Sequence, residues 1–223
     1  MNVSAAKNKA TNRGEVTRDR MMRAAERLFA IHGIENVSVR AIIVEADQKN
    51  ESALQYHFGD RAGLIKALQV QRNIEVATKR EEMMAEMFKD GHSASLRDIC
   101  FLMVMPPFQL CRSDSNFRNY IGVFGQLLLS SSRPVVSHLE KQEAESMRDS
   151  QKLLRELLPD FDDEVFAIRV ENTASFATQA MSKRARDKGT FSGKNADFFI
   201  NNLVDTMAAM MAAEISGVTQ SVR

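Results

Sequence analysis

The sequence is poor in residues that interrupt helices, and it contains no long apolar segment. Its 223 residues include four prolines and ten glycines, and few stretches alternate with the two-residue period of a strand. No apolar run approaches the roughly 20 residues needed to cross a bilayer. The first residues lack the apolar region of a secretory signal. These absences argue against a sheet protein and a membrane protein, and we expect no secretory signal.

Cysteine is also scarce, and no catalytic pattern is visible. Cys100 and Cys111 are the only two cysteines, and they lack metal-ligand spacing. We therefore expect neither a disulfide framework nor a metal site, and a reducing cytoplasm is the natural compartment. No Ser/His/Asp order, paired catalytic carboxylates or glycine-rich phosphate loop is present. Nothing in the sequence points to an enzyme or to a cofactor.

Charge is unevenly distributed, although the net charge is only +1. Residues 1–30 carry seven bases against three acids. Residues 1–14 form a polar, basic arm that we expect to be mobile. A basic segment ahead of folded helices favours contact with nucleic acid, but a solvated basic tail has the same composition.

Helical periodicity and capping residues predict an all-α fold of about nine helices and no sheet. The first four expected helices run from Thr17 to Gly33, from Ser38 through Ala46, from Glu51 to His57 and from Asp60 to Lys89. The remaining signals are a helix opened by Ser95, a bend or interruption at Pro106-Pro107, a stripe through Phe117 and Phe124, a helix from Pro134 to Pro159, one capped by Asp160 that closes before Gly189, and one from Lys194 to Ile215.

Residues 38–58 are the most informative part of the chain. Two short helices joined by a tight polar turn, packed on a longer first helix, are typical of a helix-turn-helix. Leu54 and Phe58, one turn apart, are the expected inward anchors of the second short helix. Its polar face is then free to enter a major groove. Asp47 in the turn has to adopt a conformation that normally favours glycine.

This region resembles the TetR-type repressor family. The matching stretches are Thr17 to Gly33 (TRDRMMRAAERLFAIHG), Ser38-Val39-Arg40, Glu45-Ala46, Tyr56-His57-Phe58-Gly59-Asp60-Arg61 and Leu64. The resemblance implies a DNA-binding domain over residues 15–60 and a helical ligand-binding and dimerisation domain over residues 61–223.

The resemblance also implies individual roles in DNA binding. Arg40 reaches a base or a phosphate, Ser52 and Gln55 read bases, Tyr56 and His57 contact the DNA backbone, and Arg61 binds phosphate. One departure from the family pattern is the turn Ala46-Asp47-Gln48-Lys49-Asn50, which is one residue longer than usual. Lys49, Asn50 and Glu51 therefore all remain candidates to face DNA.

The last two long helices each carry two apolar stripes, and a helix packed on only one side needs one. In a monomer the outer stripes would be exposed, so we expect a homodimer, which is also what the resemblance implies. The expected interface residues are Val165, Ile168, Phe176, Phe199, Leu203, Met207 and Met210. Which face of these helices forms the dimer stays open.

The middle of the chain is rich in large adaptable side chains, which suit a pocket for an apolar or amphipathic ligand. The candidate pocket residues are Phe101, Met103, Phe108, Phe117, Tyr120, Phe124, Met147, Phe166 and Phe176. An ordinary close-packed core would explain any single one of them equally well. A lipid-like acid, a sterol-like compound and an aromatic compound are all compatible with this composition.

Taken together, these features predict a cytoplasmic transcription regulator that binds a palindromic operator. The resemblance implies repression relieved by a small molecule, although activation is also compatible. A second hypothesis is a ligand-independent architectural DNA-binding protein with a filled core and weak sequence preference. A third is a helical enzyme with an incidental helix-turn-helix.

Overall fold

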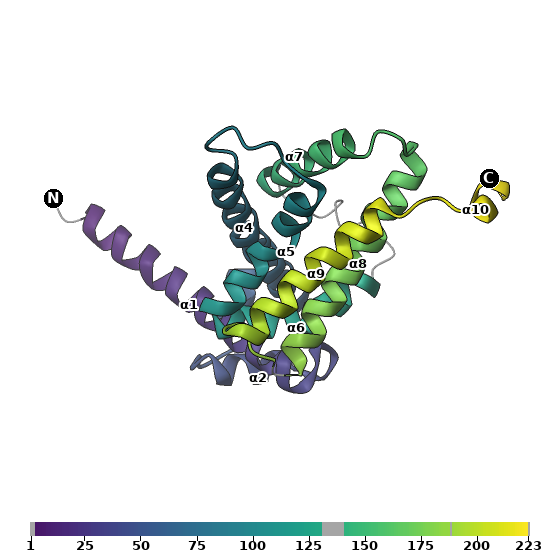
Figure 1. The fold of residues 1–223 in the computed structure, drawn as a ribbon. Helices are drawn as coiled ribbons and strands as arrows, with labels where there is room; N and C mark the ends of the chain where they lie inside the picture. Colours follow the sequence, from purple (N-terminus) through teal and green to yellow (C-terminus); the bar gives the residue numbers. More distant parts are fainter. Residues whose placement is uncertain (1–2, 131–140, 188, 223) are drawn as a thin grey trace.

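The computed structural model describes the backbone of residues 3–130, 141–187 and 189–222, and the side chains of residues 14–125, 148–187 and 189–222. These residues form ten α-helices, one short 3-10 helix and no strand, so the all-α class is confirmed (Figure 1). The elements are α1 (Val3–His32), η1 (Ile34–Asn36), α2 (Val39–Glu45), α3 (Ser52–Phe58), α4 (Arg61–Met87), α5 (Leu96–Ser113), α6 (Ser115–Ser130), α7 (Lys141–Leu157), α8 (Asp163–Arg186), α9 (Lys194–Ala212) and α10 (Gly217–Ser221).

Side-chain caps begin several helices where the sequence predicted them. The Ser38 hydroxyl accepts from the main-chain N–H of Ala41 (3.2 Å) at the start of α2. Asp60 accepts from the N–H of Gly63 (2.7 Å) at the start of α4. Ser95 and Asp98 form a reciprocal capping box at the start of α5. Each cap satisfies an N–H group that the first helical turn leaves without an intrahelical partner.

Helices α1, α2 and α3 pack around a small core together with the start of α4 and one side of α6. Its largest fully buried side chains are Phe29 and Phe124 at a ring-centroid distance of 6.3 Å, Met21, Ile42, Leu64 and Leu68. We call this group of helices α1–α3 the N-terminal unit. Figure 1 shows the first turns of α1 projecting beyond it.

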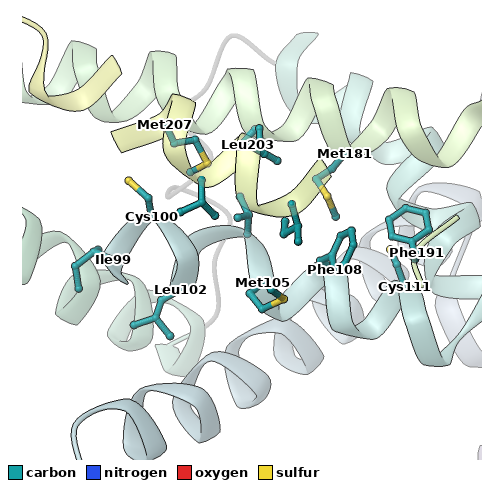
Figure 2. Packing of buried hydrophobic residues seen from close by; sticks show 14 of the residues in the cluster. Ile99, Cys100, Leu102, Met105, Phe108, Cys111, Met181, Phe191, Leu203 and Met207 are labelled. Atoms are coloured by element: carbon teal, nitrogen blue, oxygen red, sulfur yellow. The ribbon is translucent and has the colours of Figure 1, made fainter. Parts of the chain in front are cut away.

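A second, larger core surrounds α5, which lies between α4, α7 and α9. Figure 2 shows Met181 of α8 beside Phe108 of α5, and Leu203 and Met207 of α9 on the same side of α5, while Leu102 points to the opposite side. Of the bend or interruption predicted at Pro106-Pro107, the interruption is wrong, because α5 continues through both residues. Pro106 lacks the N–H that would bond the carbonyl of Leu102. The buried Arg80 on α4 donates its Nε to that carbonyl instead (3.4 Å).

Small residues bring α6 and α8 into close contact. A side-chain carbon added at Gly125 would lie 2.7 Å from Cβ of Ser182, so only glycine fits this position. The Ser182 hydroxyl donates to the carbonyl of Gly122 (3.1 Å), and Arg186 Nη1 donates to the Ser182 hydroxyl (2.7 Å). The two helices are therefore held together by shape and by buried hydrogen bonds.

Some boundaries differ from the prediction. Helix α1 begins at Val3 and not at Thr17, so most of the expected arm is helical. The cap of α8 is Asp162, which accepts from the N–H of Val165 (3.0 Å), and not Asp160. Helix α9 ends at Ala212, and α10 was not predicted. The expected start at Pro134 lies outside the described residues. Within the described ranges, no helix has the length and hydropathy of a membrane span.

Candidate nucleic-acid interface

The turn between α2 and α3 is ordered around Asp47. This residue has a φ of 55°, the left-handed conformation that the sequence predicted. The main-chain N–H of Gln48 donates to the carbonyl of Ile43 (2.9 Å), and its side-chain Nε2 donates to the carbonyl of Ala46 (3.1 Å). The longer turn is therefore a defined connection that sets α3 relative to α2.

Asn50, one residue before the N-cap Glu51, hydrogen-bonds to the first residue of α3 from within this turn. Its Oδ1 accepts a hydrogen bond from the main-chain N–H of Ser52 (3.1 Å) and a second one from the Ser52 hydroxyl. An oxygen acceptor at this place satisfies a free N–H group of the first helical turn. Among the three candidates that the sequence left open, Asn50 has this structural role, while Lys49 and Glu51 are exposed on either side of it.

The outer side of α3 is open to solvent, and its inner side is anchored. Leu54 is 3% exposed, as predicted for an inward anchor. Phe58 is half-buried, with the Arg18 guanidinium 5.4 Å from its ring centroid. By contrast, Gln55 is exposed and Tyr56 is 84% exposed. Side chains of this kind on a helix held from behind are available to an external partner.

His57 lies at the edge of this face and is half-buried. Its ring meets Tyr56 edge-on, with 4.9 Å between the ring centroids. Burial lowers the pKa of His57, and the nearby charge of Arg18 lowers it further. The ring is therefore neutral at pH 7 and able to contact DNA by a hydrogen bond and not by charge.

Arg61 is engaged by the protein itself. Its Nε donates to the carbonyl of Val37 (3.2 Å) and its Nη2 to the carbonyl of Ile34, while the guanidinium carbon lies 5.8 Å from the centroid of the Phe29 ring. These contacts tie the start of α4 to the segment around η1. Both N–H groups of Nη1 and the second N–H of Nη2 have no bond in these contacts, so Arg61 could still meet a phosphate through them. Arg40, on the first turn of α2, is exposed.

The predicted pocket residues divide between the two cores. Phe108 packs against Phe191 at a centroid distance of 5.3 Å in the larger core. Tyr120 and Phe124 stack at 4.7 Å and face the N-terminal unit. Phe117 is buried, Phe101, Met103 and Phe166 are half-buried, and Phe176 is exposed. The side chain of Met147 lies outside the described residues.

The predicted dimer residues also separate into two groups. Leu203 and Met207 point into the protomer's own core, with 3% and 0% exposure, which corrects the expectation that they lie on an outer face (Figure 2). The half-buried residues are Val165, Phe199 and Met210. Ile168 and Phe176 are exposed on α8, as expected for an outer stripe.

Sequence reasoning missed two features. Phe198 is 74% exposed on α9, but its neighbour Phe199 is equally apolar, and periodicity could not choose between them. Glu26 and Arg72 form a buried ion pair between α1 and α4. Each lies on an otherwise apolar stripe, Glu26 between Met22 and Phe29, and a charge at such a position is the signal that could have found the pair. In the described part of the chain, no group of three or more His, Cys, Asp or Glu side chains is placed to hold a metal ion.

Comparisons with known proteins agree with this architecture. A family model described as "Tetracyclin repressor-like, C-terminal domain" matches residues 102–213, and one described as "Bacterial regulatory proteins, tetR family" matches residues 21–68. A comparison with curated proteins gave no match.

Solved structures show the same fold. A transcription regulator from Shewanella sp. PV-4, assigned to the TetR family, has a TM-score of 0.60 at 14% identity, over 89% of this chain and 99% of that one. A TetR-family regulator from Rhodococcus sp. has a TM-score of 0.57 at 14% identity, over 86% and 98%. With both family models matched in order along the helices described above, the chain belongs to the TetR family of DNA-binding bacterial transcription regulators.

Proposed function

We propose that this protein is a repressor that binds a palindromic operator as a homodimer and leaves it when an apolar or amphipathic ligand binds. The observation that carries the proposal is the outer face of α3. Tyr56 and Gln55 are open to solvent, whereas Leu54 behind them is buried. A recognition helix built in this way presents its polar face to the major groove.

Within this face we assign different tasks to different residues. Gln55 has a side chain that can pair with a base edge, so it contributes to sequence preference. Arg40 and Lys49 are exposed cations and contribute phosphate contacts, which act on every DNA sequence. Tyr56 and His57 contact the backbone as neutral groups. Asn50 acts through its hydrogen bonds to the start of α3.

The dimer is supported by apolar side chains that the protomer leaves exposed on two neighbouring helices. Ile168 is 50% exposed and Phe176 37% on α8, and Phe198 is 74% exposed on α9. Figure 1 shows α8 and α9 side by side along one side of the molecule. A second copy that covers this surface would bury these residues and would place two recognition helices on one palindromic site.

The ligand proposal rests on the larger core. Thr173 is fully buried on α8, and its hydroxyl has no hydrogen-bond partner among the described residues. It lies on the same stripe as Phe166, Val170 and Ala177, which pack against that core. A buried hydroxyl among apolar side chains suits a ligand that is mainly apolar and carries one polar group.

The test is selection of DNA by the purified protein from random duplexes, followed by affinity measurements. We expect two inverted half-sites whose centres are about one helical turn, or about 10 base pairs, apart. Gln55→Ala should change the selected sequence, whereas Lys49→Ala should weaken binding to all sequences. Selection of no sequence, with equal affinity for all duplexes, would contradict the proposal and favour the architectural alternative.

Release by a ligand is tested separately. A panel of fatty acids, sterols and aromatic compounds is screened for an increase in Tm, and each hit is then titrated into the protein–operator complex. We expect a hit to weaken operator binding, because a ligand shifts an equilibrium only if it binds the two states differently. A ligand that raises Tm and leaves operator affinity unchanged would contradict the release mechanism.

A further inference from the structure

Besides the hydrogen bonds from Arg61 to the carbonyls of Val37 and Ile34, two kinds of contact join the N-terminal unit to the rest of the molecule. One is apolar: Phe29 of α1 meets Phe124 of α6, and Tyr120 stacks on Phe124. The other is ionic and centres on Arg72 of α4. The apolar contact contributes affinity between the two parts, but hydrophobic burial is non-directional and does not by itself select one angle.

The ionic contact is bidentate and buried. Arg72 Nε lies 2.7 Å from Oε1 of Glu26, and Arg72 Nη2 lies 2.8 Å from Oε2 of the same carboxylate. Glu26 is 1% exposed and Arg72 is 6% exposed. Two parallel N–H···O bonds between planar groups fix orientation as well as distance. This pair therefore fixes the orientation of the Glu26 carboxylate on α1 relative to the Arg72 guanidinium on α4.

The same guanidinium reaches a third element. Arg72 Nη1 lies 2.7 Å from Oε2 of Glu75 and 3.2 Å from Oδ2 of Asp114, which stands immediately before α6. Asp114 Oδ1 accepts from the N–H of Asn116 (2.8 Å) in the first turn of α6. The guanidinium carbon lies 5.3 Å from the centroid of the Phe117 ring. One side chain on α4 thus contacts α1, the start of α6 and an aromatic ring of α6.

We infer that the network of Glu26, Arg72 and Asp114 is a positioning device that sets the angle of the N-terminal unit on α4 and α6, and with it the spacing of the two recognition helices. The inference rests on the proposed function, since spacing matters only for a dimer on a two-part operator. The inference goes beyond that function by naming the residues that determine which operator spacing the dimer accepts. The network borders a cleft of about 240 Å³ lined by residues of α1, α4, α5 and α6, so these helices are not close-packed against one another beside the network.

A purely stabilising role predicts a different result. Buried ion pairs are weak evidence for stability, because an apolar pair of similar volume is often as stable or more stable. The double variant Glu26→Leu/Arg72→Met removes both charges, so neither is left buried without a partner. Glu75 and Asp114 are about one-third exposed and become hydrated. If the network only stabilises the fold, the double variant should keep both the stability and the spacing preference of the wild type. If the network sets the angle, the double variant should keep its stability and lose the spacing preference.

The experiment compares operators of altered spacing. The half-sites selected by the wild-type protein are moved apart or together by one base pair, about 3.4 Å along the helix. Affinity for the three spacings is measured for the wild type and for the double variant, together with Tm, dimer content and affinity for a single half-site. The control is Arg27→Gln/Glu45→Gln, which removes an exposed ion pair between α1 and α2 inside the N-terminal unit (2.9 Å).

We expect the wild type and the control to bind one spacing more tightly than the other two. The ratio of affinities should be about 5- to 150-fold, the range that is typical of energetic coupling between sites. In the double variant this preference should fall close to onefold, while Tm, dimer content and half-site affinity stay near their wild-type values. Asp114→Asn keeps the cap of α6 and weakens one arm of the network, so it should give an intermediate preference.

Wild-type spacing preference in a folded, dimeric double variant would overturn the inference and leave the proposed function intact. Failure of the wild type itself to select a two-part operator would overturn both. A double variant that does not fold would show that the network stabilises the chain. In that case Asp114→Asn decides: an unchanged spacing preference overturns the inference, and a reduced one supports it.

Discussion

At the residue scale, the proposed DNA-binding surface of α3 and the turn before it combines a charged side chain with neutral ones, and salt dependence can separate their contributions. Lys49 is an exposed cation, so a phosphate contact by it releases a counterion. We expect Lys49→Ala to lower the slope of log affinity against log salt concentration by about 1. His57→Gln should weaken binding at pH 7.5 without changing this slope, because the lowered pKa keeps His57 neutral.

The measurement is operator affinity at four or five salt concentrations for each variant. Glu35→Gln, on the exposed surface of η1, serves as a control for loss of a charge elsewhere in the same part of the chain. A reduced slope for His57→Gln at pH 7.5 would mean that the ring is charged on DNA.

Thr173 permits a second test at this scale. Its buried hydroxyl has no partner among the described residues, and an unpaired buried polar group costs about 1–3 kcal/mol. Valine has nearly the same shape without the hydroxyl. We expect Thr173→Val to raise the free energy of unfolding by about 1 kcal/mol, measured by urea denaturation. A matched change at an exposed position, Thr190→Val, should have little effect, and a loss of stability in Thr173→Val would show that the hydroxyl is bonded.

At the element scale, α5 depends on Arg80 because of Pro106. Pro106→Ala restores an N–H that can bond the carbonyl of Leu102, and the hydrogen bond from Arg80 then becomes redundant. We therefore expect Arg80→Met to destabilise the Pro106→Ala background less than the wild type, by about 1 kcal/mol. The four proteins of this double-mutant cycle are compared by chemical denaturation. Equal costs of Arg80→Met in both backgrounds would rule out this role of Arg80.

The start of α5 predicts a pH dependence. Burial opposes ionisation of Asp98, but hydrogen bonds from the Ser95 hydroxyl and main-chain N–H, together with His92, outweigh it and lower the pKa of Asp98. A carboxyl group with a lowered folded-state pKa stabilises the protein above its unfolded-state pKa and loses this effect as pH falls through the folded-state pKa. We expect the wild type to be more stable than Asp98→Asn at pH 7 and the difference to vanish in acid. A difference that is constant from pH 7 to pH 3 would contradict this.

Helix starts were predictable because their causes are local. Ser38, Asp60 and Ser95 bond to N–H groups three residues ahead, and such spacings are visible in the sequence. The continuation of α5 was not predictable, because Arg80 lies 22 residues before Leu102. The hydrogen bonds of Arg61 were not predictable for the same reason, because the carbonyls that accept them lie 24 and 27 residues away in the sequence. Local chemistry is readable in a sequence, and compensation from a distant element is not.

Site residues follow the same rule. The left-handed turn at Asp47 and the inward anchor Leu54 follow from local pattern, and both predictions are confirmed. The division of the apolar stripes of α9 was not predictable, because both stripes have helical spacing. Which of them faces the protomer's own core depends on where α5 lies, and only the fold determines this.

At the scale of the whole molecule, the exposed apolar residues of α8 and α9 predict how dimerisation can be broken. A charge at the centre of a buried apolar interface leaves an ion without water or a partner. We expect Phe198→Glu or Ile168→Glu to raise the dimer dissociation constant by about 30-fold or more, the effect of a 2 kcal/mol interface residue. Sedimentation at several concentrations measures it. Val218→Glu is the control, since this residue is exposed on α10, away from the surface of α8 and α9.

The close seam between α6 and α8 couples assembly to DNA geometry. Gly125 lets α6 approach Ser182 of α8 closely, and the hydrogen bond from Ser182 to Gly122 joins the same two helices, so we expect a displacement of α8 to be passed to α6. In the proposed dimer the partner protomer would cover the outside of α8, while on the other side of α6 the Phe124 ring meets Phe29 of α1. The contact between α6 and α8 would therefore connect dimer formation to operator geometry. Sequence changes that weaken this contact would leave the dimer intact and change the operator spacing that it prefers.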